Sequence, residues 1–84
     1  MIVRSTVTFA ELRDLLLDLG FTVGKRGKGW FFEHAPSETW FRFRPYRARE
    51  KVTAIDLHMT RKHLDWRGVL PPEEFDDRLK KATA

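Results

Sequence analysis

Cysteine is absent from this 84-residue sequence, which excludes disulfide bonds, thiol chemistry and thiolate metal sites. No apolar run approaches the roughly 18 residues that a membrane-spanning helix needs. Residues 1–9 also lack the long apolar core of a secretory signal. The length allows one small domain over residues 1–84, without internal repeats or low-complexity tracts. We therefore expect a single cytoplasmic domain with no membrane contact.

Motifs of the common cofactor and hydrolase families are missing as well. There is no G-x-S-x-G, no Walker loop and no dinucleotide fingerprint. The glycine-rich stretch 24–29 leads into a strand pattern, so no helix N-terminus stands behind it to hold a phosphate. His58 and His63 are five positions apart on an expected helix and do not share a face, which disfavours a metal pair. The sequence predicts no cofactor and no bound metal.

Positive charge is concentrated in the middle of the chain. Residues 22–51 contain eight basic and three acidic residues, a net charge of +5, whereas the remainder carries −1. Such a segment is typical of a surface that binds a polyanion, nucleic acid above all. The simpler interpretation is a charged, well-solvated hairpin.

The first expected element is a helix over residues 8–19. Thr8 and Glu11 form a capping-box pattern, and Gly20 is a suitable residue to end the helix. Apolar residues follow at spacings of three and four, which predicts one buried stripe: Phe9, Leu12, Leu15, Leu16 and Leu19.

Three β-prone segments follow the first helix: 21–23, 30–34 and 39–44. Gly24–Gly29 is expected to be a flexible turn and residues 35–38 a second turn. In the third segment alternation places Phe41 and Phe43 on one face. The opposite face is predicted to hold Trp40, Arg42 and Arg44, with Phe31 and Glu33 beside them from the second strand.

A second helix is expected from Thr53 to Gly68, and a short third helix over residues 71–82. The second helix has apolar residues on two sides: Leu57 and Leu64 on one, and Ile55, Met59 and Trp66 on the other. It should therefore touch both the sheet and a second surface, either the C-terminal segment or a partner chain. The predicted fold class is α+β, in the order α-β-β-β-α with a three-stranded antiparallel sheet and an added C-terminal helix.

Basic residues interleaved with aromatic ones form the main candidate binding site, because arginine holds phosphates and aromatic rings stack on bases. The alternative is that the aromatic residues pack the core or a protein interface, which would make the chain a non-catalytic interaction module. The candidate nucleic-acid-binding residues are Lys25, Arg26, Lys28, Trp40, Arg42, Arg44, Arg47, Arg49 and Lys51.

Residues 9–21, reading FAELRDLLLDLGF, together with 26–34, reading RGKGWFFEH, resemble HicA-like toxins. The resemblance covers about residues 6–68 and leaves the C-terminal helix as an extension. It implies a fold like that of double-stranded-RNA-binding domains, with helices on one face of the sheet. It further implies an mRNA endoribonuclease of a toxin–antitoxin system, bound by a HicB-like antitoxin.

One departure from the family puts catalysis in doubt. The family's catalytic histidine follows the turn glycine by two positions, and with Gly27 as that glycine its place is taken by Gly29, which cannot transfer a proton. His34 is the nearest histidine and a candidate substitute, although alternation places it on the opposite sheet face from position 29. Three explanations follow: the chain is a non-cleaving relative, another group takes the place of the histidine, or the residue was altered to make a toxic protein tolerable. As written, the chain is expected to bind RNA but to cleave it slowly or not at all.

Overall fold

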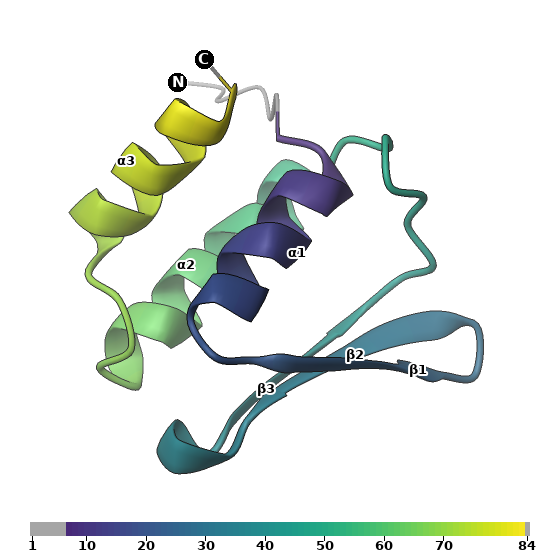
Figure 1. The fold of residues 1–84 in the computed structure, drawn as a ribbon, viewed down its shortest axis with the longest axis horizontal. Coiled ribbons are helices and arrows are strands. Elements are labelled where there is room, and N and C mark those ends of the chain that lie inside the picture. Colours follow the sequence, from purple (N-terminus) through teal and green to yellow (C-terminus); the bar gives the residue numbers. More distant parts are fainter. Residues whose placement is uncertain (1–6, 84) are drawn as a thin grey trace.

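The structure is a computed structural model that describes the backbone of residues 7–83 and their side chains, except at positions 26 and 80–83 (Figure 1). The elements are α1 (Phe9–Asp18), β1 (Thr22–Arg26), β2 (Gly29–His34), a 3-10 turn η1 (Ala35–Ser37), β3 (Thr39–Phe43), α2 (Ala54–Trp66) and α3 (Pro72–Thr83). The predicted α+β order with an added C-terminal helix is confirmed.

Helix α1 begins and ends where its capping residues predict. Thr8 accepts a hydrogen bond from the Glu11 backbone, and the Glu11 carboxylate accepts one from the Thr8 backbone at 2.8 Å, completing a capping box. Gly20 follows the helix with a φ of 96°, a left-handed conformation that glycine adopts without steric cost. The predicted apolar stripe is buried at Phe9, Leu12, Leu15 and Leu16, whereas Leu19 at its end is only partly buried.

The three strands form one antiparallel sheet in the order β1-β2-β3, so β1 and β3 are both edge strands. The expected flexible turn over Gly24–Gly29 is wrong, because β1 continues to Arg26 and β2 begins at Gly29. Only Gly27 and Lys28 connect them, and Gly27 has the φ of 60° that a tight type II′ hairpin needs at its first position.

Helices α1 and α2 cover one face of the sheet, and α3 packs against both (Figure 1). The core between these layers includes Phe9, Phe32 and Leu64, all completely buried. Helix α3 adds Phe75, and the Arg61 guanidinium makes two hydrogen bonds to Asp76 at 3.0 and 3.1 Å, joining α2 to α3. The opposite sheet face has no helix of the described chain upon it (Figure 1).

Candidate functional site

An aromatic pair lies on the sheet face that points away from the helices. The rings of Phe31 and Trp40 stack with centroids 6.1 Å apart and an interplanar angle of 24°. Trp40 is 59% exposed. Arg42 lies directly opposite Phe31 in the register, and Glu33 opposite Trp40. The predicted placement of these four residues on one open face is confirmed.

Arg44 departs from that predicted face. Its guanidinium lies over the Tyr46 ring, 5.5 Å from the centroid, on the helix side of the sheet. The alternation ends because β3 stops at Phe43 and the Tyr46 backbone N–H donates to the Arg44 carbonyl at 2.7 Å, which turns the chain. Pro45 stands between them and cannot extend the strand.

A tryptophan joins the hairpin to the segment that follows β3. The Trp30 indole N–H donates to the Tyr46 carbonyl at 3.0 Å, and the Lys25 ammonium lies 5.0 Å from the centre of the Trp30 ring. Lys25 and Arg44 are thus held over neighbouring rings at the same end of the sheet. Lys25 therefore belongs to the helix side of β1 rather than to a mobile loop.

The remaining candidate cations lie on this same side of the molecule. Lys28 is exposed in the β1–β2 turn, while Arg47, Arg49 and Lys51 are exposed on the segment 44–53. Figure 1 shows the turn and this segment on one side of the molecule. We call this group, with Lys25 and Arg44, the basic end. The Arg26 side chain lies outside the described part of the chain, although its backbone pairs with Gly29.

His34 is separated from these residues. Its ring stacks on Phe21, with centroids 5.0 Å apart, on the helix side of the sheet, and it is half-buried. Its Nδ1 lies 2.7 Å from the Ser37 hydroxyl, which in turn lies 2.7 Å from the Thr39 hydroxyl. By strand alternation Gly29 belongs to the open face with Phe31, so the predicted opposition of His34 and Gly29 is confirmed.

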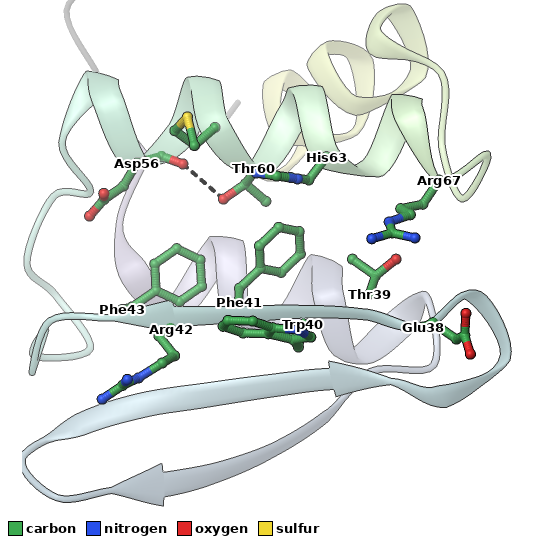
Figure 2. Close-up of a pocket in the computed structure, with 11 residues that line it drawn as sticks. Glu38, Thr39, Trp40, Phe41, Arg42, Phe43, Asp56, Thr60, His63 and Arg67 are labelled. Atoms are coloured by element: carbon green, nitrogen blue, oxygen red, sulfur yellow. Dashed lines mark hydrogen bonds between the residues drawn. The ribbon is translucent and has the colours of Figure 1, made fainter.

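A groove that the sequence did not predict lies between the β3 edge and α2 (Figure 2). Its volume is about 380 Å³, and its lining includes Phe41 and Phe43 from β3 and Met59, Thr60, His63 and Arg67 from α2 and its end. Figure 2 shows the α2 side chains directed toward the strand. The one sequence signal for it was the second apolar side of α2, which includes Met59.

No cluster of three or more histidine, acidic or cysteine side chains placed to hold a metal occurs within residues 7–83 as described. No helix in the described chain is long and apolar enough to cross a membrane. Comparison of the chain with protein-family models, with curated proteins and with solved structures finds no match.

Proposed function

We propose that this protein binds single-stranded RNA on its open sheet face and basic end. The observation that carries the proposal is the exposed Trp40 ring, stacked on the half-buried Phe31 ring, with Arg42 beside the pair. An antiparallel sheet that presents aromatic rings to solvent offers stacking platforms for unpaired bases, as other RNA-binding sheets do. The neighbouring arginine can hold the phosphate that links two stacked bases.

The distribution of charge supports a path for the RNA backbone. Lys28 is exposed in the β1–β2 turn, and Arg47, Arg49 and Lys51 are exposed on the segment 44–53, whose residues 48–51 lie against the start of α1. On the open face itself Glu33 is the acidic neighbour of Trp40. An RNA strand that stacks on the aromatic pair would therefore run from Trp40 past Arg42 toward the basic end, away from Glu33.

Cleavage of the bound RNA is not part of this proposal. Gly29 stands at the position that the HicA resemblance assigns to the catalytic histidine, and His34 is half-buried on the other side of the sheet. Loss of a general acid or base typically lowers a rate by about 10²–10⁴-fold. The protein is proposed as an RNA-binding member of a HicA-like toxin fold, and a HicB-like antitoxin remains a prediction from the resemblance.

The test is RNA binding by the protein and two tryptophan variants. A fluorescently labelled, unstructured RNA oligonucleotide is titrated with the protein, and anisotropy is read at several salt concentrations. Stacking contributes about 1–3 kcal/mol per base, so Trp40→Ala should weaken binding by about tenfold. Trp66→Ala is the matched control, because Trp66 is 67% exposed on α2, away from the open face.

Arg42→Ala should lower the slope of log affinity against log salt by about 0.7, which is the effect of one phosphate contact with a single strand. Lys62→Ala removes an equal charge from α2 and should leave the slope unchanged. Equal losses for Trp40→Ala and Trp66→Ala would contradict the placement of the site. Absence of binding at low salt would favour the interaction-module interpretation instead.

A further inference from the structure

We propose that two copies of this chain associate through their β3 edges into a two-fold symmetric dimer, with the two sheets joined into one and the α2 helices side by side. The proposal goes beyond RNA binding and does not depend on it. It is carried by three features of the same border of the molecule: an open strand edge, a self-complementary row of side chains and an exposed apolar stripe.

The two edges of the sheet differ in how they are protected. Edge strands commonly carry lysine or other features that discourage pairing with another chain. The β1 edge has Lys25 and Gly24, and its Val23 is 38% exposed. The β3 sequence Thr39–Phe43 contains neither lysine, glycine nor proline. The β3 edge is therefore the better template for a further strand.

The hairpin determines which backbone groups of β3 face outward. In a two-residue hairpin the flanking residues, here Arg26 and Gly29, exchange both backbone hydrogen bonds. Because the direction of the backbone groups alternates along a strand, those of Gly29 and Phe31 point to β1, and those of Trp30 and Phe32 point to β3.

The same alternation of backbone groups, followed through the β2–β3 register, shows which β3 groups lie on the outer edge of the sheet. Phe32 pairs with Phe41, so the Phe41 backbone groups point to β2. The N–H and C=O groups of Trp40 and Arg42 then point away from the sheet, toward the groove border. A second β3 pairing antiparallel about a two-fold axis at Phe41 places Trp40 of each copy directly opposite Arg42 of the other.

This register makes the outer row of side chains self-complementary. Each Trp40 ring would face an arginine of the second copy, an arrangement stabilised by cation–π attraction. Arg44 does not extend this row, because β3 stops at Phe43 and the Arg44 guanidinium lies over the Tyr46 ring. An axis at Arg42 would instead set two like charges against each other, which is unfavourable.

The helix above the edge carries the apolar stripe. Ile55, Met59 and Trp66 are spaced four and seven residues apart and are 75%, 48% and 67% exposed. Positions at this spacing follow one line along a helix, the seam used in helix pairs. Lys62 lies on this line between Met59 and Trp66, with its ammonium 5.4 Å from the centre of the Trp66 ring. Met59 also lines the groove, so the stripe borders the β3 edge. Pairing of two β3 strands brings the two stripes toward each other and buries them.

The test uses the absence of cysteine in the chain, because any introduced thiol is then unique. Directly opposite residues of a hydrogen-bonded pair have Cα atoms about 5.5 Å apart, within the range that a disulfide spans. Trp40→Cys protein is mixed with Arg42→Cys protein under mild oxidation, and cross-linked species are distinguished by mass. Gly24→Cys is the control on β1, where an added Cβ meets no atom within 4 Å.

We expect the mixed disulfide to predominate and the Gly24→Cys protein to remain uncross-linked. A Trp40→Cys or Arg42→Cys disulfide between identical chains that forms faster than the mixed one would overturn the register. Cross-linking at Gly24→Cys as efficient as the mixed reaction would show random collision and overturn the interface.

Sedimentation of the unmodified chain provides an independent measurement. The protein should dimerise reversibly, and Met59→Glu should weaken the dimer by at least about tenfold, because a charge placed at a buried apolar contact is costly. Leu17→Glu is the matched control on α1, where Leu17 is 41% exposed. A monomer at every concentration, or equal weakening by both variants, would overturn the proposal.

Discussion

The Tyr46 hydroxyl donates a hydrogen bond to the Asp56 carboxylate at 2.6 Å and accepts one from the Thr53 backbone N–H at 3.1 Å. At the start of α2 this hydroxyl thereby provides an acceptor for one backbone N–H that has no partner within the helix and a donor for one carboxylate. The Tyr46 ring also stacks on Phe9 of α1, with centroids 5.4 Å apart. This tyrosine therefore joins the segment after β3 to both helices that cover the sheet.

Tyr46→Phe should lower the free energy of unfolding by about 1.5–3 kcal/mol, the range for a hydrogen bond to a charged group. The ring packing is kept, so the loss reports the hydroxyl alone. Urea unfolding followed by circular dichroism measures it. Asp56→Asn serves as a comparison, since it keeps an oxygen acceptor; a larger loss for Asp56→Asn would show that charge at the helix start matters more than the hydroxyl.

Leu16→Ala should cost about 2–4 kcal/mol of stability, because Leu16 is completely buried in the core and truncation leaves a cavity. Leu17→Ala is the neighbouring control, since its side chain is 41% exposed. It should change stability by less than about 0.5 kcal/mol. Similar losses from the two variants in urea unfolding would contradict the orientation of α1.

Replacing Lys28, Arg47 and Arg49 together with alanine should weaken RNA binding and reduce its salt slope. Three lost phosphate contacts correspond to a slope change of up to about 2 for single-stranded RNA. A control variant removes three charges from the helical layer, at Arg13, Lys62 and Arg67. An unchanged slope in the first variant, or the same change in both, would show that the basic end does not hold the RNA backbone.

Gly29→His should introduce or raise RNA cleavage, because histidine can act as an acid or a base near neutral pH. Position 29 lies at the start of β2 on the open face, beside the β1–β2 turn and its Lys28. Cleavage of labelled RNA is followed on gels, with Gly29→Gln as a control of similar size that does not titrate. Strong cleavage by the unmodified chain that His34→Ala abolishes would assign the chemistry to His34 instead.

Local patterns in the sequence were sufficient for most of the secondary structure. The capping box of Thr8 and Glu11 and the spacing of the buried leucines predicted α1, because both signals act within a few residues of the chain. Alternation in β3 predicted that the side chains of Trp40 and Arg42 lie on the other face of the sheet from that of Phe41. The glycine-rich hairpin was predicted less well, since pairing with β2 extends β1 to Arg26 despite its glycine.

Only part of the candidate site could be predicted from the sequence, and the reason is physical. Alternation and charge place side chains on a face, but contacts between distant segments depend on how the layers pack. The bond from Trp30 to the Tyr46 carbonyl joins residues 16 positions apart, and it holds Lys25 and Arg44 at one end of the sheet. The β3–α2 groove likewise depends on how α2 packs over β3, because Phe41 and Met59, which both line it, come from distant segments. By itself the sequence determined the helices and most of the strand faces. Tertiary packing decided the extent of the β1–β2 hairpin, the position of Arg44 and which faces remained open to a ligand or a second chain.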